Sequence, residues 1–238
     1  MGIKSTRQKP RNTLLTIIYR LEKWLPLSKT AKFDLFLNLE WIFDRLSHEM
    51  SFKIYSPENH PVRQRSKTFI LSNIDKTSVV LDLGCNQGDI SFIIAEKAKE
   101  VVGIDYNPSA IVKAKQFYKK TNLHFENREA LEFLKENSKQ FDILILSHIL
   151  EHLDNPKQFL LEFKDFFKMI YIEVPDFDRT YLNQYRKDFD FTPINTDDDH
   201  ISEFDRLDLE TLLSECNIEK IKEEYRFGVQ KIWCKVNC

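Results

Sequence analysis

The stretch VVLDLGCNQG, residues 79–88, decides the fold, and the rest of the chain is organised around it. Its first five residues form an apolar run interrupted only by Asp82, which is typical of a buried parallel strand. Gly84 and Gly88 then frame a turn, and residues 89–99 have the pattern of a helix. Only five glycines occur in 238 residues, and two stand in this turn. Because glycine allows close backbone approach and positive φ, the turn predicts a ligand crevice at the end of the strand.

Strand and helix patterns alternate after this turn. The predicted strands are 79–83, 100–104, 123–126, 142–146 and 169–174, and the predicted helices are 90–98, 109–120, 130–136 and 157–167. Such repeats form a parallel sheet with right-handed crossovers. A helix at 210–215 and two strands around Gly228, 218–225 and 229–236, follow as a hairpin. We therefore predict an α/β fold with a doubly wound, mostly parallel, Rossmann-like sheet of about seven strands, a C-terminal antiparallel hairpin and an N-terminal helical extension.

The N-terminal part differs from the rest in charge. Residues 1–32 carry eight Lys and Arg against one Glu, a net charge of +7, whereas residues 33–238 carry 27 basic and 36 acidic residues, a net charge of −9. Helical spacing of apolar residues continues over 13–25, until Pro26, and over 30–50. We expect residues 1–62 to form a basic arm and a helical cap or lid. An amphipathic foot on an anionic membrane is the alternative.

Cysteine usage and hydropathy indicate the compartment. The four cysteines form no CxxC pair and no disulfide framework, which favours a reducing, cytoplasmic location. No apolar run reaches the roughly 18 residues that a membrane span needs. The apolar stretch 14–19 is too short for a signal peptide and stops at Arg20.

A second motif, VVGIDYNP, occupies residues 101–108 and places Asp105 at the end of the second strand. An acidic residue there can accept hydrogen bonds from both hydroxyls of a ribose. Asp105 follows Gly84 by 21 residues, as a βαβ unit requires. The alternative is that Asp105 caps the helix opened by Pro108. The glycine turn at the right distance favours the ribose role.

These motifs resemble those of the class I S-adenosylmethionine-dependent methyltransferases. VLDLGCNQG is similar to their first motif and VVGIDYNP to their second, FDILILSHILEHLDNP (141–156) to the fourth-strand motif, and MIYIEVPDFD (169–178) to the strand that follows. The resemblance covers about residues 65–236 and is closest to small-molecule and glycan O-methyltransferases. It implies a methyltransferase domain over 63–238, with an insertion near 176–204 that builds the acceptor pocket.

The resemblance also implies a binding site for S-adenosyl-L-methionine at the strand ends. The turn would hold the methionine part of the cofactor, Asp105 its ribose, and four residues further along the chain its adenine and sulfonium ends. The residues implied are Asp82, Gly84, Cys85, Asn86 and Gly88 in the turn, Asp105, Tyr106 beside the adenine, Glu129 at the adenine amine, and Ser147 with His148 at the sulfonium.

A nicotinamide-binding oxidoreductase is the alternative for this fold. Its GxGxxG fingerprint lets a helix N-terminus meet a pyrophosphate. This chain lacks the third glycine, and Asp82 would repel a pyrophosphate but would suit an ammonium group. The charge of the turn therefore favours S-adenosylmethionine independently of the motifs.

Three histidines are candidates for catalysis. Methyl transfer to a hydroxyl needs a base, and neutral imidazole suits that task. His148 and His152 follow the fourth strand in the segment HILEH, and His200 follows three aspartates at 197–199. HILEH also matches a zinc-protease signature by letter, but that signature requires a long helix and not a strand end.

A metal site is the less favoured interpretation of the same segment. Some ubiquinone-pathway and small-RNA methyltransferases bind a divalent ion through ExxEH at this place. This chain departs from that pattern because His148 stands at the first position. Its ligands would be His148, Glu151, His152 and His200. We expect a metal-free site, with His152, His200 or His148 acting on the acceptor.

The sequence thus predicts an O-methyltransferase acting on a sugar or related small metabolite in surface-glycan or lipid biosynthesis. An RNA methyltransferase guided by the basic arm is one alternative, and a catalytically silent partner subunit is another. The acidic body disfavours nucleic acid as a partner. Peripheral membrane contact through the basic N-terminus and the oligomeric state stay open.

Overall fold

The computed structural model describes residues 13–56, 59–136, 140–191, 197 and 199–237. It divides into two compact units, Met1–Ile42 and Phe43–Cys238. The predicted basic arm up to residue 12 lies outside the described residues. The boundary expected near residue 62 falls inside the second unit, and the role of residues 1–62 as a cap or lid stays a prediction.

The second unit is built on one seven-stranded sheet. Its strands are β1 (Val79–Leu83), β2 (Glu100–Ile104), β3 (Leu123–Glu126), β4 (Ile143–Ser147), β5 (Met169–Pro175), β6 (Ile218–Arg226) and β7 (Val229–Val236). They lie in the order β3-β2-β1-β4-β5-β7-β6. Strands β1 to β5 are parallel, and β7 is antiparallel to both of its neighbours. The predicted fold class, with its C-terminal hairpin, is confirmed.

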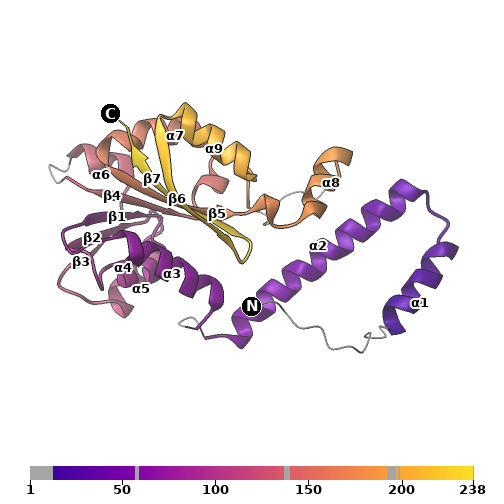
Figure 1. Cartoon of the computed structure of the whole chain (residues 1–238). Coiled ribbons are helices and arrows are strands. Elements are labelled where there is room, and N and C mark those ends of the chain that lie inside the picture. Colours follow the sequence, from indigo (N-terminus) through magenta and orange to yellow (C-terminus); the bar gives the residue numbers. More distant parts are fainter. Residues whose placement is uncertain (1–12, 57–58, 137–139, 192–196, 198, 238) are drawn as a thin grey trace. The chain divides into compact units, whose positions relative to one another are not determined.

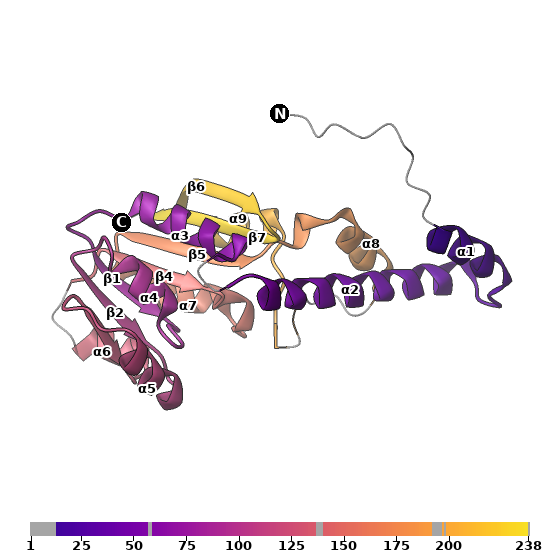
Figure 2. The same cartoon turned by 90° about the horizontal axis from the view of Figure 1, so that it is seen from below.

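Helices cover both faces of this sheet (Figures 1 and 2). They are α3 (Pro61–Asn73), α4 (Asp89–Ile94) and α5 (Pro108–Phe117) on one face, and α6 (Ala130–Glu136), α7 (Pro156–Phe163) and α9 (Arg206–Glu215) on the other. Two clusters of buried apolar side chains match the two layers, and neighbours along one strand belong to different clusters: Leu144 to one, Ile143 and Ile145 to the other. Burial on both faces explains why the strands read as continuous apolar runs.

The start of α5 decides between the two interpretations of Asp105. The N-cap is Asn107, whose side chain accepts hydrogen bonds from the backbone of Ser109 and Ala110, and Pro108 opens the helix. Asn and Pro are the residue types favoured at these two positions. The alternative that Asp105 caps this helix is therefore wrong.

Helix α8 (Tyr181–Phe189) was not predicted from the sequence. It follows the short 3-10 helix η4 (Phe177–Arg179), and Thr180 caps its start. Tyr181, Tyr185 and Phe189 are spaced four residues apart and are exposed. This four-residue spacing indicates a helix, but it places only a single row of aromatic rings on one face. Such a narrow apolar face is a weak pattern for predicting a helix.

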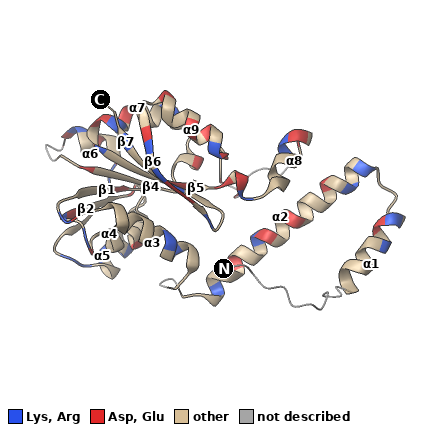
Figure 3. Cartoon of the chain, viewed as in Figure 1, with Lys and Arg blue, Asp and Glu red and all other residues tan. Residues whose placement is uncertain are grey.

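The first unit contains α1 (Thr13–Leu21), the 3-10 helix η1 (Glu22–Trp24) and the beginning of α2 (Lys29–Ile54). The Lys32 ammonium donates to the backbone oxygen of Glu22 at 2.5 Å, joining the two helical segments. Acidic and basic positions both occur along the ribbon of α2 (Figure 3). Across the described residues, no helix combines the length and the apolarity needed to cross a bilayer.

The later part of α2 belongs to the second unit and is held there by ion pairs. Arg179 pairs with Asp44 at 2.6 Å, and Arg45 pairs with Asp197 at 2.7 Å. These contacts fix α2 to both ends of the segment that was predicted to be an insertion.

Candidate active site

The turn after β1 requires glycine for two physical reasons. Gly84 and Gly88 have φ values of +69° and +87°. A Cβ on Gly84 would lie 2.3 Å from Ile149 Cδ1, and one on Gly88 would lie 2.5 Å from Phe125 Cζ. Any side chain at these positions would meet both strain and overlap. The turn therefore brings its backbone close to the segment after β4 as well as to β3.

Asp105 is tied directly to this turn. Its carboxylate accepts hydrogen bonds from the backbone N–H of Asn86 at 2.9 Å and of Asn107 at 2.8 Å. Beside it, the ring of Tyr106 is 88% exposed. A partly exposed carboxylate can accept hydrogen bonds from ribose hydroxyls, and an open aromatic face can stack on a base, so these residues fit the implied cofactor. Glu129 accepts from the backbone N–H of Glu132 at 2.8 Å, at the start of α6.

Asp82 is the buried carboxylate of the turn. It lies in the middle of the sheet and accepts a hydrogen bond from the Ser91 hydroxyl. Burial raises its pKa to about 7, the nearby charge of Asp105 acts in the same direction, and the Ser91 hydrogen bond opposes both. A carboxylate in this state gains from a cation, as the ammonium of S-adenosylmethionine would be. Burial likewise raises the pKa of the Cys85 thiol far above its usual range. Cys85 therefore lines the site as an unreactive thiol.

The ends of β1 and β4 meet beside the turn. Leu83 is in register with Leu146 in the parallel pair, so Ser147 and His148 follow directly alongside Gly84. Ser147 is partly buried and is in register with Glu173 of β5. The structure thus brings the predicted sulfonium-side residues next to the predicted methionine-side turn.

His148 is held between two carboxylates. Its Nδ1 lies 2.9 Å from Glu151 Oε1, and its Nε2 lies 3.5 Å from Glu173 Oε1. Burial of the ring nitrogens lowers the pKa of His148, but hydrogen bonding to Glu151 and Glu173 outweighs it and raises the pKa to about 10. The backbone of His148 takes a φ of +55°, uncommon for a residue other than glycine. Both carboxylates therefore favour the imidazolium form of His148, although 43% of its side chain is exposed.

Glu173 is a site residue that the sequence analysis missed. It is buried in β5 and accepts hydrogen bonds from the hydroxyls of Tyr171 and, at 2.8 Å, Ser66 of α3. Burial disfavours its charged form, but the hydrogen bond and charge of His148 dominate and lower its pKa. The signal in the sequence was a single carboxylate inside the apolar strand MIYIEVP. Glu173 fixes the orientation of His148.

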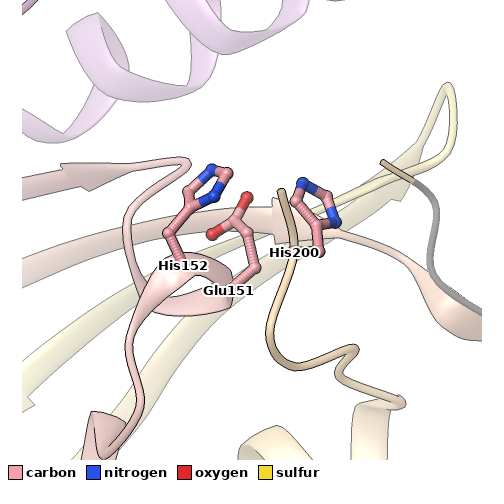
Figure 4. A group of neighbouring side chains, drawn as sticks. All are labelled: Glu151, His152 and His200. Carbon is pink, nitrogen blue, oxygen red and sulfur yellow. The ribbon is translucent and has the colours of Figure 1, made fainter. Parts of the chain in front are cut away.

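His152 and His200 come together from distant parts of the chain (Figure 4). Their ring centroids are 4.9 Å apart in an edge-on arrangement. His152 Nδ1 lies 3.1 Å from the backbone oxygen of Asp199, and His200 Nδ1 lies 2.8 Å from Glu203 Oε1. An imidazole nitrogen facing an oxygen carries the proton, so both rings are set in the Nδ1–H form.

Glu151 connects the two histidine segments. It lies in the 3-10 helix η2 (Leu150–His152), and its backbone oxygen accepts from the N–H groups of Ile201 at 2.9 Å and Ser202 at 3.1 Å. Its Oε2 is buried and has no hydrogen-bond partner among the described atoms. A buried carboxylate oxygen of this kind gains from a proton donor or a cation nearby.

Three of the four candidate metal ligands lie together in the structure, and His148 does not join them. One potential ligand atom from each of Glu151, His152 and His200 lies within 4.8 Å of the others. Both ring nitrogens of His148 face carboxylates instead, so His148 stands outside this group. The chemistry of two imidazoles and a carboxylate suits a transition-metal ion or Zn²⁺. Metal dependence stays an open alternative to the metal-free site.

Fold and site together define a class I S-adenosylmethionine-dependent methyltransferase. A family model described as a methyltransferase domain matches residues 74–225, and the chain belongs to that family. Its cofactor is S-adenosylmethionine. The residues assigned to the individual parts of the cofactor, from Asp82 to Ser147, stay predictions.

Proteins of similar sequence match parts of this chain. A ubiquinone biosynthesis O-methyltransferase of Coxiella burnetii is 30% identical over 82 residues, which is 34% of this chain and 35% of that protein. A protein of Mycoplasma mobile described as an uncharacterised RNA methyltransferase is 40% identical over 70 residues, 28% of this chain and 19% of that protein. The chain therefore spans about a third or less of these two relatives.

A solved structure confirms the fold. The N-methyltransferase NodS of Bradyrhizobium japonicum in complex with S-adenosyl-L-homocysteine has a TM-score of 0.55 and 14% identity, over 77% of this chain and 92% of that one. At 14% identity this similarity supports the fold of the chain but does not identify its methyl acceptor.

Proposed function

We propose that the enzyme transfers the methyl group of S-adenosylmethionine to a hydroxyl of a sugar or a related small metabolite, with His152 or His200 as the general base. The observation that carries the proposal is the edge-on pair of imidazoles, both in the Nδ1–H form, at the carboxyl end of β4. In that form Nε2 has the lone pair that accepts a proton. A hydroxyl acceptor needs such a group because it must lose its proton as the methyl arrives.

The other residues bind and orient. S-adenosylmethionine supplies an electrophilic methyl, so alignment of the acceptor oxygen provides much of the acceleration. Asp82 and Asp105 would hold the charged and ribose parts of the cofactor, and Ser147 and His148 would border the methyl. His148 is a weaker candidate for the base than the pair, because an imidazolium has no lone pair with which to accept a proton.

One feature supports a small acceptor methylated on oxygen, and a second suits an acceptor with a polar ring such as a sugar. A ubiquinone biosynthesis O-methyltransferase is among the relatives, and its name denotes methylation of a small molecule on oxygen. On α8, the rings of Tyr181 and Tyr185 meet edge to face at 5.6 Å and are exposed. Exposed tyrosines offer both a flat apolar face and a hydroxyl to a polar ring-shaped ligand.

A methyl-transfer screen tests the proposal. The protein would be incubated with S-adenosylmethionine labelled in the methyl group and with nucleotide sugars, phosphorylated sugars, quinone precursors and RNA. Label in a sugar hydroxyl is the expected result. Label in RNA would support the alternative named above, consistent with the Mycoplasma mobile relative. Calorimetry that detects no cofactor binding would indicate a silent partner subunit.

Chelation separates the base from the metal alternative. Activity that survives a chelator is expected if His152 or His200 is a base. Activity that is lost to the chelator and restored by a divalent ion would make Glu151, His152 and His200 ligands instead.

A further inference from the structure

The first unit exposes an unusual amount of apolar side chain. Every residue of α1 is exposed, and Leu14, Ile17, Ile18 and Leu21 share one helix face by their spacing. The segment after α1 continues this surface, because Trp24 is 85% exposed and two leucines beyond it are also open. We define the lipid-facing surface by its members, Leu14, Ile17, Ile18, Leu21, Trp24, Leu25 and Leu27. Such a contiguous apolar surface marks an interaction site.

The N-terminal segment of the same unit is rich in basic residues: residues 1–32 carry eight Lys and Arg against one Glu, and the acidic Asp34 and Glu40 follow on α2. Thr13, Thr16 and Arg20 form the opposite stripe of α1 in the sequence, and Lys23 follows in η1. Glu22 is the one acidic residue up to position 32, and it pairs with Lys32. Figure 3 shows the ribbon of α1 largely without acidic positions. The charge of this segment is therefore complementary to an anionic surface.

We propose that the first unit docks the enzyme on an anionic lipid bilayer, with the lipid-facing surface in the headgroup region and the basic residues at the phosphates. An apolar helix face with Trp, flanked by Lys and Arg and too short to span, is the pattern of an interfacial helix. RNA would use the charges but not the apolar face. A second copy of the chain, whose residues 33–238 carry a net charge of −9, is the competing occupant, and light scattering distinguishes it. Lipid uses both the charges and the apolar face.

Vesicle sedimentation with the whole 238-residue chain tests this docking. Wild-type protein should bind vesicles of phosphatidylcholine with phosphatidylglycerol at least about tenfold more strongly than phosphatidylcholine alone, and binding should weaken as salt is raised. Equal binding to both vesicles, or binding to neither, would overturn the proposal. Vesicle binding is measured without a methyl acceptor, so its result is independent of whether the proposed function is correct.

Two variants separate the apolar and the charged contribution. L14D/I18D and R20S/K23S should each reduce binding to the anionic vesicles by about tenfold. L207D is the matched control, because Leu207 is 70% exposed on α9 of the other unit, and it should bind as wild type. Cofactor affinity, measured by calorimetry, should be unchanged in all three. Retained vesicle binding in L14D/I18D would overturn the proposal, as would light scattering that shows a dimer broken by this variant without any vesicle binding.

Discussion

The two halves of the proposed active site are built in different ways. On the cofactor side, the turn after β1 and Asp105 lie within one βαβ unit, and their contacts are hydrogen bonds between neighbouring segments. On the acceptor side, His152 and His200 come from segments 48 residues apart, joined by the backbone contacts of Glu151. The first side is a property of local sequence and the second a property of tertiary structure. We therefore expect mutations to separate cofactor binding from catalysis.

The largest separation is expected at the histidine pair. H152A or H200A should lower kcat by about 10²–10⁴-fold, the usual contribution of a general base, with the cofactor dissociation constant unchanged. Initial rates and calorimetry measure the two quantities. H124A is the matched control, since His124 is exposed on β3, and it should keep the wild-type rate. Full rates in both H152A and H200A would point to an amine or thiol acceptor.

A glycine pair tests whether the turn is fixed by packing as well as by φ. G84A and G228A both force alanine into a positive φ, at a cost of about 1–2 kcal/mol in the free energy of unfolding. At Gly84 the new Cβ would also lie 2.3 Å from Ile149 Cδ1, so this terminal methyl would have to shift, whereas at Gly228 the nearest atom, Arg179 Cδ, lies 3.4 Å away. Denaturant titration should show G84A as the less stable variant. Its cofactor affinity should fall at least about tenfold, while G228A binds normally. Equal stability would refute the packing argument.

Asp105 probes the cofactor side alone. D105A should weaken S-adenosylmethionine binding by roughly 1–3 kcal/mol, the value of a charge-assisted hydrogen bond. Part of the loss would come from the turn, since Asn86 loses its acceptor. D165A, at an exposed carboxylate, serves as control in the same calorimetry. An unchanged dissociation constant in D105A would remove Asp105 from the ribose site.

The last comparison concerns the pH dependence set by Asp82. Its pKa is raised from 3.8 to about 7 in the folded chain, so folding favours its protonated form. Its contribution to the free energy of unfolding is complete below about pH 4 and is lost as the pH rises through 7. Cofactor affinity should change in the opposite sense, rising over that upper range as the carboxylate ionises. In D82N both dependences should flatten, which denaturation and calorimetry at several pH values would reveal.

The same contrast explains which features the sequence predicts. The strands and their order follow from apolar runs such as Ile143–Leu146, because parallel strands buried on both faces leave that pattern. The glycine turn and Asp105 follow from a fixed spacing within one βαβ unit. Family motifs carried the choice of cofactor, and the structure adds the contacts that make the turn rigid.

Features that depend on distant contacts could not be predicted in this way. The segment HILEH does not indicate that His148 contacts Glu173 or that His152 contacts His200. These partners lie on β5 and in a loop that follows it. Helix α8 was missed because its apolar face is a single row of rings. Charge states such as that of His148 depend on burial, which a sequence pattern does not measure.

The most direct test of the central claim is the identity of the methylated atom. S-adenosylmethionine carrying a carbon-13 methyl group would be turned over with the acceptor found in the screen, and the product examined by NMR. The account predicts a methyl carbon bonded to oxygen, formed by the wild type and almost absent with H152A or H200A. A methyl carbon bonded to nitrogen, sulfur or carbon, or one formed at the wild-type rate by both variants, would contradict base-assisted O-methylation.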